Sequence, residues 1–468
     1  MKTRTLLELT RYLQQLLGDD YAAFAEAPME PPALRINTLK SERTTLLRHF
    51  ERWGVSARPH PVNPDGLVLE EDRLPLSHTL AFFAGAFAYQ GLSSQLPVLA
   101  LDPRPGERVL DLCAAPGSKS TQIAALMQNR GQLLLNDSSG RRLQPLMANL
   151  FSAGVLNSCL LNLPGQSLGR HFPEQFDRVL VDAPCSALSN LPTRAFQSQW
   201  SPTFLEKISG IQEQLLISGI KTARIGGVIV YSTCSICPEE DERVLERILS
   251  RYPVELETIP FSSAPCCRPP LTAYQGHTFP AALQRAVRIH PWPLPFEGFF
   301  IARLRKTGPL PIRPVTETMP WVDSLTAGDP AIAPLLDHLE TLWGLPVEAL
   351  HAGRFLRTQH RLWILAPEWE RLPQRTLMMA GLPLAHQKTN FWRLTTPAIQ
   401  RFSDQALQPV IEFSDTELKE LFREGRLPAP AGPLRYHILQ VGGRNLAAVA
   451  QSEGFYRIHL PHRFTLVL

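Results

Sequence analysis

The sequence predicts an α/β protein whose central domain is a doubly wound parallel sheet. Residues 86–306 alternate strand-like and helix-like segments at intervals of about 25 to 40 residues, the rhythm of strand–helix–strand units. Two apolar, β-branched runs in this region, 179–185 and 228–235, break into loops that carry cysteines. Ligands of open α/β sheets collect at such strand ends. We therefore expect a binding site where these two runs stop.

Four segments are expected along the chain. Residues 1–85 form a small N-terminal α/β domain, in which 35–38 reads as a strand, and residues 86–306 form the parallel-sheet domain. Residues 307–322 are a linker, because the stretch from Lys306 to Pro320 carries four prolines and no periodicity. Residues 323–468 form a C-terminal α+β domain.

Composition limits the functional class. A chain of 468 residues with 44% hydrophobic content can bury two or three cores. No apolar stretch approaches a membrane span, and the N-terminus lacks a signal-peptide core. Of the seven cysteines, several stand in motifs that need free thiols, which indicates a reducing compartment, so we expect a cytoplasmic protein. The net charge of +4 is compatible with a polyanionic partner.

The segment 108–127 predicts a ligand-binding turn. An apolar strand ends in a turn of small residues, and a helix begins near Ser118, where its N-terminus favours an electron-rich group. The Pro116-Gly117 pair leaves one glycine, so the turn matches neither GxGxxG nor a Walker loop. A dinucleotide or ATP site is therefore disfavoured.

A second strand, 131–137, ends in Asp137, which lies 26 residues after Asp111. An acid at the end of the second strand is placed to bind both ribose hydroxyls of an adenosyl ligand. The order strand, turn, helix, strand, acid predicts a nucleoside-containing cofactor.

Cys185 and Cys234 follow the two strand-like runs, and both thiols are expected to face one pocket. Lone cysteines at strand ends are more often packing residues, so this alternative stays open for each thiol alone. The spacing of Cys234 and Cys237 is that of a redox or zinc pair, yet no second such pair follows, and Cys266-Cys267 are poorly spaced for chelation. No metal site is expected.

These motifs together resemble the Nol/Nop/Sun family of RNA cytosine-C5 methyltransferases. The resemblance rests on 111–119, 182–186 and 231–235 with Glu239-Glu240 after it, and it spans residues 30 to 305. Four flanking stretches agree with it: 34–40, 89–97, 200–202 and 297–305. The order of motifs and the tail most resemble the bacterial 16S ribosomal RNA members that have a PUA-like C-terminal domain.

The resemblance implies a Rossmann-like class I methyltransferase fold with S-adenosylmethionine as methyl donor, and a last strand at 298–304 that closes the sheet edge antiparallel. The residues that would hold the donor are Cys113, Ala114, Ala115, Pro116, Gly117, Ser118, Lys119, Asp137, Arg142 and Asp182.

It also implies the catalytic roles. Cys234 would attack C6 of the cytosine, which makes the electron-poor C5 nucleophilic, and Cys185 would release the product. Asp182 would hydrogen-bond the base near N3, where charge accumulates, and Lys119 would supply positive charge.

Three positions depart from the family pattern. Pro164 stands where the family has an aspartate for the adenine amino group, so either cofactor affinity is lower or another residue substitutes. Ala187 replaces a glycine, and Arg194 alone remains of an expected basic pair. The intact Asp182 and both cysteines favour an active enzyme over a decayed core.

The tail is expected to bind RNA. Between His351 and Arg401 eight Lys/Arg face only Glu368 and Glu370. Aromatic residues are interleaved there, as in many RNA-binding surfaces: Phe355, Trp363, Trp369, Phe391 and Trp392. A solvated basic face over an ordinary core is the alternative, and the resemblance favours RNA. Strand-like runs at 436–441 and 445–450, separated by Gly442-Gly443, suggest a small β-barrel.

The expected function is methylation of 16S ribosomal RNA, as part of a 30S particle or late precursor, by a monomer. Two alternatives stay open: the same chemistry on transfer RNA, and a ribosome-assembly factor that binds RNA with a decayed methyltransferase core.

Overall fold

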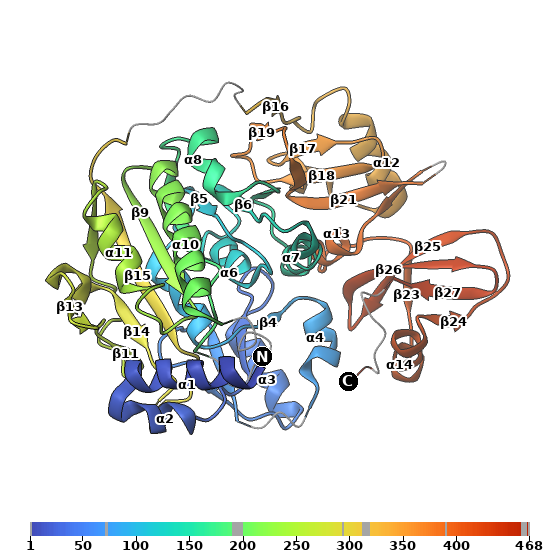
Figure 1. The fold of residues 1–468 in the computed structure, drawn as a ribbon. Coiled ribbons are helices and arrows are strands. Elements are labelled where there is room, and N and C mark those ends of the chain that lie inside the picture. The colour runs from blue at the N-terminus through green and yellow to red at the C-terminus, as the bar shows by residue number, and fades with distance from the viewer. Residues whose placement is uncertain are drawn as a thin grey trace.

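The computed structural model describes residues 2–70, 74–189, 200–292, 294–310, 319–388, 391–459 and 466. A ten-stranded sheet forms its centre, with the strand order β11-β14-β15-β9-β8-β5-β6-β7-β20 and β10 paired to β15 (Figure 1). Five consecutive strands of this order are parallel: β5 (Arg108–Asp111), β6 (Gln132–Asn136), β7 (Ser158–Leu161), β8 (Phe176–Asp182) and β9 (Ala223–Thr233). The prediction of a doubly wound parallel sheet is confirmed.

Helices cover both faces of this sheet because successive strand side chains point to opposite faces. Leu110 and Val179 pack on one face, and their neighbours Val109 and Leu180 pack on the other. The first face is covered by α10 (Pro202–Thr222), α11 (Glu242–Leu249) and α8 (Leu168–His171). The second is covered by α5 (Leu96–Leu101), α6 (Ser118–Leu126) and α7 (Gly140–Ala153).

The antiparallel strand expected at the sheet edge is β15 (Phe299–Lys306), which runs antiparallel to β9. It is not the edge, however. Three more strands extend the sheet beyond it: β10 (Val254–Glu257), β14 (Val287–Ile289) and β11 (Cys267–Arg268). The strand is central because residues 254–289 fold back as an antiparallel extension, which local pattern does not reveal.

The N-terminal region has a four-stranded sheet with the order β2-β3-β1-β4. Its strands are β1 (Ala33–Ile36), β2 (Ala57–Pro59), β3 (Gly66–Leu69) and β4 (Phe87–Tyr89), with α3 (Arg43–Arg52) and α4 (Leu80–Phe83) between them. The sheet therefore reaches past residue 85. Helices α1 (Lys2–Leu17) and α2 (Tyr21–Ala25) precede this sheet in the chain. Their side chains Leu9, Leu13 and Phe24 pack against Trp200 and Leu205 of the central domain rather than in the core of this sheet.

The two larger sheets in the described part of the tail each have their own core. The first comprises β17 (Arg354–Arg357), β18 (Arg361–Leu365), β21 (Leu382–Gln387) and β22 (Trp392–Leu394), beside α12 (Ala333–Trp343) and α13 (Thr396–Arg401). The second comprises β23 (Val410–Glu412), β24 (Arg426–Pro428), β25 (Arg435–Val441), β26 (Arg444–Ser452) and β27 (Phe455–Ile458), beside α14 (Asp415–Glu424). The two strands expected around Gly442-Gly443 are β25 and β26, which pair antiparallel.

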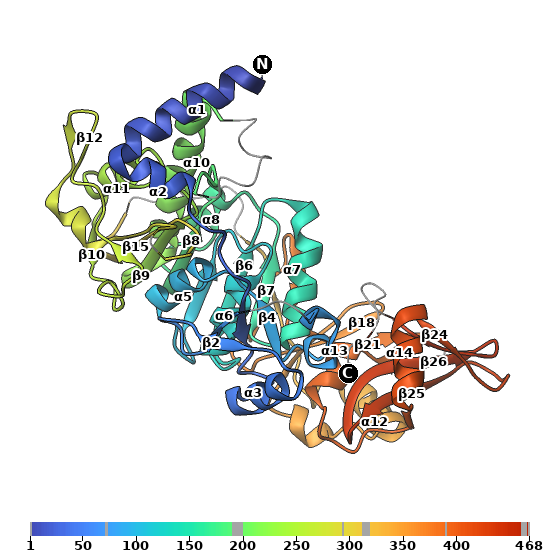
Figure 2. The ribbon, with the colours of Figure 1, turned by 90° about the horizontal axis from the view of Figure 1, so that it is seen from below.

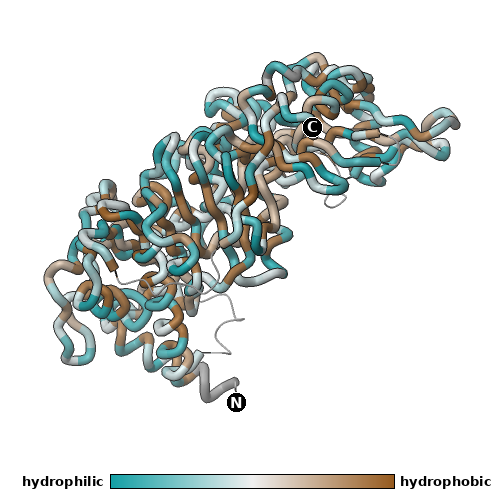
Figure 3. Tube along the Cα trace, turned by 90° about the horizontal axis from the view of Figure 1, so that it is seen from above, coloured by the Kyte–Doolittle hydropathy of each residue, from teal (hydrophilic) through white to brown (hydrophobic). Residues whose placement is uncertain are grey.

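The tail also extends the central sheet. Strand β20 (Leu377–Ala380) pairs antiparallel with β7, and the indole Nε1 of Trp369 donates to the carbonyl of Asn157 at 2.8 Å. The views from below and from above show α1 and the tail sheets at opposite ends of one elongated molecule, with hydrophobic residues concentrated on the central strands (Figures 2 and 3).

The expected linker, 307–322, is described only at its two ends, and 311–318 lies outside the described residues. Leu310, Trp321 and Val322 pack against the core of the central domain, and Trp321 pairs with the ring of Phe172 at 6.0 Å. Trp321 and Val322 belong to β16 (Trp321–Asp323), which pairs with β19 (Arg371–Pro373). The described ends of this segment are therefore packed structure.

Among the helices of the described residues, none is long and apolar enough to cross a membrane.

Candidate active site

The predicted site residues lie at the carboxyl ends of four adjacent parallel strands, β9, β8, β5 and β6. Cys234 follows β9, Asp182 ends β8 with Cys185 three residues later, the small-residue turn follows β5, and Asp137 follows β6. In the sheet, β6 and β7 lie on one side of β5, whereas β8 and β9 lie on its other side. The order of strands therefore reverses between β5 and β8. Such switch points form the ligand crevice of open α/β sheets.

The turn after β5 is tied to its neighbour strands. The N–H of Leu112 donates to the Leu180 carbonyl at 3.0 Å, and that of Ala114 donates to the Asn136 carbonyl at 2.8 Å. Gly117 has φ +107°, and a Cβ there would lie 2.7 Å from Cδ1 of Leu146, so this position requires glycine. Helix α6 begins at Ser118 as expected, although Gly117, not Ser118, occupies the cap position.

Asp137 faces this turn. Its Oδ2 accepts from the N–H of Ala115 at 3.2 Å and its Oδ1 from the N–H of Ser139 at 2.9 Å. Arg142 pairs with the same carboxylate at 3.7 Å and donates to the Ala115 carbonyl. The loop and the acid therefore form one unit, with Arg142 on its outer side.

Asp111 is a site residue that the motif reading used only as a spacing marker. It is fully buried, its Oδ2 accepts from Ser120 Oγ at 2.7 Å, and its Oδ1 has no hydrogen-bond partner among the described residues. Burial raises the pKa of Asp111 to about 7. Its position at the last residue of β5, beneath the turn, was the available sequence signal.

This donor and acceptor set fits S-adenosylmethionine. Asp137 supplies an acceptor for ribose hydroxyls, and the small side chains of Ala114 and Ala115 leave the backbone of the turn accessible for close approach. The unpartnered oxygen of Asp111 is a further acceptor beneath the same turn.

The two cysteines meet, as expected. The sulfur atoms of Cys185 and Cys234 are 2.6 Å apart, and both side chains are half-buried. The hydrogen bond to Cys234, together with burial, raises the pKa of Cys185 well above its usual value.

Lys119 and Asp182 form an ion pair next to the thiols. Lys119 Nζ lies 2.9 Å from Asp182 Oδ2 and donates to Ser94 Oγ at 2.9 Å, while Asp182 Oδ1 accepts from Ser232 Oγ at 2.7 Å. Burial lowers the pKa of Lys119, but Asp182 and Cys234 outweigh it, so the net pKa shift is upward. A permanent positive charge thus faces both the acid and a sulfur.

The other cysteines do not join this pair. Cys237 is buried, with a pKa raised by burial, and burial likewise raises the pKa of Cys113 in the turn. Within the described ranges, no cluster of three or more His, Cys, Asp or Glu side chains is arranged to hold a metal ion.

The family departures have different structural settings. Ala187 adopts φ +52°, in the left-handed region that favours glycine. Pro164 is exposed in the turn after β7, where Asn136 binds both the N–H and the carbonyl of Leu163 at 3.0 Å. Arg194 lies outside the described residues.

The aromatic residues of the tail are mostly core residues, which corrects the expectation that they stack RNA bases. Phe355, Trp363, Trp369 and Trp392 are buried, and only Phe391 is partly exposed. Their partners come from distant strands, so periodicity within 351–401 does not reveal their burial. The basic side chains nearby remain at the surface, and Arg361 covers the Trp363 ring at 5.8 Å.

A Rossmann-like sheet whose switch point carries a small-residue turn, a second-strand acid and two facing thiols fits the class of S-adenosylmethionine-dependent methyltransferases. The family comparison agrees. The model of the 16S rRNA methyltransferase RsmB/F family matches residues 98–305, and that of the RsmF/B-like ferredoxin-like domain matches residues 9–74. The chain belongs to the 16S rRNA methyltransferase RsmB/F family.

Curated relatives extend this similarity into the tail. Ribosomal RNA small subunit methyltransferase F of Klebsiella pneumoniae (strain 342) is 32% identical over 426 residues, covering 86% of this chain and 83% of the relative. The protein of the same name from Cronobacter sakazakii is 38% identical over 308 residues, covering 63% of this chain and 62% of the relative.

Solved structures support the fold of nearly two thirds of the chain. A methyltransferase homologue from Pyrococcus horikoshii is 33% identical with a TM-score of 0.57, covering 63% of this chain and 93% of that protein. NSun6 from Pyrococcus horikoshii, solved with SFG, is 24% identical with a TM-score of 0.55, covering 64% of this chain and 98% of that protein, and shows the fold alone.

Proposed function

We propose that this enzyme transfers a methyl group from S-adenosylmethionine to C5 of a cytosine in 16S ribosomal RNA, through a covalent bond between Cys234 and C6. The observation that carries the proposal is the meeting of two thiols from adjacent strand ends beside the Lys119–Asp182 pair. A methyltransferase that acts on an already nucleophilic atom needs no such pair of thiols.

The roles follow from the geometry. Cys234 is the nucleophile, because the positive charge of Lys119 beside it stabilises the thiolate that remains when its thiol proton passes to solvent. Its sulfur adds to C6, and the electron pair of the C5–C6 double bond becomes available at C5. N3 takes up a proton from solvent as negative charge arrives there, and the carboxylate of Asp182, oriented by Lys119 and Ser232, accepts a hydrogen bond from this N3–H.

The remaining steps restore the base. S-adenosylmethionine, when bound, supplies an electrophilic methyl group, and C5 takes it. Cys185, which loses its thiol proton to solvent after Cys234 has bonded to C6, then accepts the proton from C5. The C5–H electron pair re-forms the C5–C6 double bond, the bond from C6 to Cys234 breaks with its electrons going to sulfur, and N3 releases its proton to solvent. Asp137 and the turn at 113–119 hold the cofactor on the opposite side of the switch point from the thiols.

We also propose that the tail and the N-terminal sheet bind the RNA that flanks the target cytosine. The support is the excess of basic side chains at 351–401, among which Arg357, Arg361 and Arg375 are exposed. A substrate in the ribosome would place the enzyme in the cytoplasm. The predictions that it is a monomer and holds no metal stay predictions.

Bisulfite sequencing tests the proposal directly. The purified enzyme and S-adenosylmethionine are incubated with one of three RNA samples at a time. The samples are 30S particles, naked 16S RNA and transfer RNA, each from cells that lack the gene. We expect new protected cytosines in the ribosomal samples alone. Protection in transfer RNA alone would move the substrate to that class. An enzyme that binds RNA but shows no cofactor binding by calorimetry would be a decayed assembly factor.

A further inference from the structure

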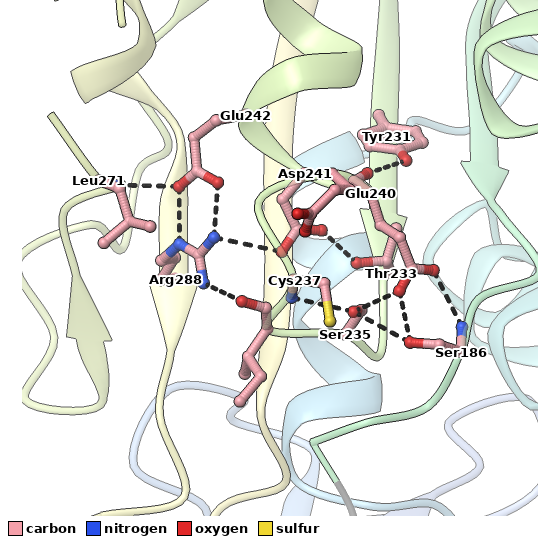
Figure 4. A network of polar contacts seen from close by, with 12 residues as sticks. Ser186, Tyr231, Thr233, Ser235, Cys237, Glu240, Asp241, Glu242, Leu271 and Arg288 are labelled. Carbon is pink, nitrogen blue, oxygen red and sulfur yellow. Dashed lines mark hydrogen bonds and ion pairs between the residues drawn. The ribbon is translucent and has the colours of Figure 1, made fainter. Parts of the chain in front are cut away.

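The carboxylate of Glu240 lies between the two loops that carry the thiols, and Figure 4 shows the network around it. This side chain is fully buried. Its Oε1 accepts from Ser235 Oγ at 2.7 Å and from Ser186 Oγ, and its Oε2 accepts from the N–H of Ser186 at 2.9 Å. Ser186 directly follows Cys185, and Ser235 directly follows Cys234. A single carboxylate therefore binds both cysteine loops.

The connection to the Cys185 loop is reinforced by Gln212 of α10. Its Nε2 donates to Glu240 Oε2 at 2.8 Å and to the carbonyl of Pro184 at 2.9 Å. The residues on both sides of Cys185 are thus tied to Glu240, one directly and one through Gln212. The backbone of Glu240 is itself fixed, because the Tyr231 hydroxyl of β9 donates to its carbonyl.

The network requires a carboxylate. Both oxygens receive donors: two hydroxyls, one backbone N–H and one amide NH₂. Glutamine has the same shape but only one oxygen. Wherever its NH₂ group is placed, at least one hydrogen of the two serine hydroxyls, the Ser186 N–H or the Gln212 amide loses its acceptor. A buried charge is expensive for stability alone, which indicates that it serves another purpose here.

We propose that Glu240 is a positioning residue that sets the separation and orientation of the Cys185 and Cys234 thiols. The inference rests on the proposed function, in which one sulfur must reach C6 while the other reaches the proton on the neighbouring C5. Glu240 acts through Ser186 and Ser235, at the base of the loops. Since a misplacement of about 1 Å can cost on the order of 100-fold in rate, a loosened pair of loops slows catalysis without touching substrate binding.

Glu242 provides a matched control. It belongs to the same acidic run and is also fully buried, but its carboxylate binds Arg288 Nε at 2.7 Å and the N–H of Leu271 at 2.9 Å. Neither partner lies in a cysteine loop, and the contact that Arg288 makes with the Cys234 loop, to the Ile236 carbonyl at 2.9 Å, does not involve Glu240. Glu242→Gln therefore damages a buried ion pair of similar cost and leaves the Glu240 contacts in place.

The first experiment compares Glu240→Gln with Glu242→Gln in the full-length enzyme. We expect Glu240→Gln to lower kcat for RNA methylation by about 100-fold, while KM for RNA and the S-adenosylmethionine dissociation constant change less than about twofold. Glu242→Gln should lower the unfolding temperature at least as much yet keep kcat within about threefold. Equal losses of kcat in both variants would show a merely structural role and overturn the proposal.

The second experiment measures the thiol pair without RNA or cofactor. Diamide takes up the two thiol hydrogens and is reduced to the hydrazine, leaving a Cys185–Cys234 disulfide that peptide mapping quantifies. Because disulfide formation needs a specific sulfur geometry, its rate should fall about tenfold or more in Glu240→Gln and stay unchanged in Glu242→Gln. An unchanged rate in Glu240→Gln would overturn the proposal.

The two readouts separate this inference from the proposed function. A slower disulfide in Glu240→Gln, with no methylation by any form including the wild type, would keep the positioning role and reject cytosine methylation. Should Glu240→Gln fail to fold, Ser235→Ala takes its place, since it removes one bond to Oε1. A disulfide rate in Ser235→Ala equal to that of the wild type would then reject the proposal.

Discussion

Ala187 stands two residues after Cys185 with φ +52°, a conformation that costs about 1–2 kcal/mol for a residue with a Cβ atom. The glycine expected at this position in the family has no such cost. The loop conformation is thus retained although the residue that favours it is absent. The contacts of Ser186 to Glu240 and of Ser189 Oγ to the Cys234 carbonyl at 2.8 Å account for this, because they hold the backbone on both sides.

Ala187→Gly should therefore stabilise the protein. We expect the free energy of unfolding to rise by about 1 kcal/mol, because glycine adopts the left-handed conformation without strain. Urea unfolding measures it. The matched control is Ala148→Gly on the exposed side of α7, where the same change should cost about 1 kcal/mol. Opposite signs in the two variants support the assignment, and a loss in both contradicts it.

The two thiols have different roles, and their variants should differ accordingly. Cys234→Ala can form no bond to C6, so neither methylation nor adduct is expected. Cys185→Ala should still attack and methylate but fail to eliminate, so that an RNA-linked enzyme accumulates and survives SDS gel electrophoresis. The control is Cys159→Ala, a buried cysteine of β7 far from the thiol pair, which should lose stability alone. An adduct with Cys234→Ala and none with Cys185→Ala would reverse the roles.

At the scale of elements, the parts predictable from sequence are those that local pattern determines. The strand at 108–111, the turn, the helix from Ser118 and the strand before Asp137 are contiguous, and each carries its own signal. The thiol pair could be predicted for the same reason, since both cysteines follow strands that run parallel. The distances between these side chains, and the roles of Asp111 and Glu240, depend on how separate loops pack.

The elements that sequence reasoning misplaced depend on distant partners. Trp369 belongs to a run of tail residues that looked like an RNA-binding surface, yet it packs into the core of the central domain. Strand β20 has no pattern that identifies β7 as its neighbour, because both faces of a short apolar strand look alike in sequence. For the same reason, the sequence pattern wrongly places β15 at the edge of the sheet, although β10 and β14 pair with it there.

The docking of Trp369 on Asn157 predicts a specific consequence of its removal. Trp369→Ala should cost about 3–5 kcal/mol and raise the hydrogen-exchange rate of the amides in β7, because the edge of the central sheet loses its cover. Trp343→Ala removes an equally large, buried side chain from the first tail core. That control should destabilise the tail and leave exchange in β7 near the wild-type rate. Equal protection of β7 in both variants would mean that the contact does not support the sheet.

At the scale of the whole molecule, the tail is tied to both other regions. It supplies β20 to the central sheet, and Gln400 of α13 bonds to the N-terminal region through Lys40 Nζ at 3.1 Å and the Phe83 carbonyl at 3.1 Å. Phe83 also meets Phe422 of α14 edge to face at 5.2 Å. The central domain is therefore not independent of the tail, and removal of 323–468 should destabilise the core.

Lys40 makes this junction sensitive to pH. Burial, with a smaller repulsion from Arg401, lowers its pKa to about 7 from an ordinary value of 10.5. Between these values the unfolded chain binds more protons than the folded one, so stability should rise as pH increases from about 7 to about 10. Lys40→Met keeps the length and removes the charge, and it should flatten the dependence of the unfolding temperature on pH over this range. Lys419, exposed on α14, is the control, and an unchanged slope in Lys40→Met would contradict the junction.

The pairing of β20 with β7 also constrains how the polypeptide is made. Translation completes β7 roughly 200 residues before β20 is available, and at 5–20 residues per second this interval lasts about 10–40 s. During that time the nascent chain carries an open strand edge, the kind of surface on which other chains pair and aggregate. The central sheet is thus finished by a strand of the tail, long after its five parallel strands have been made.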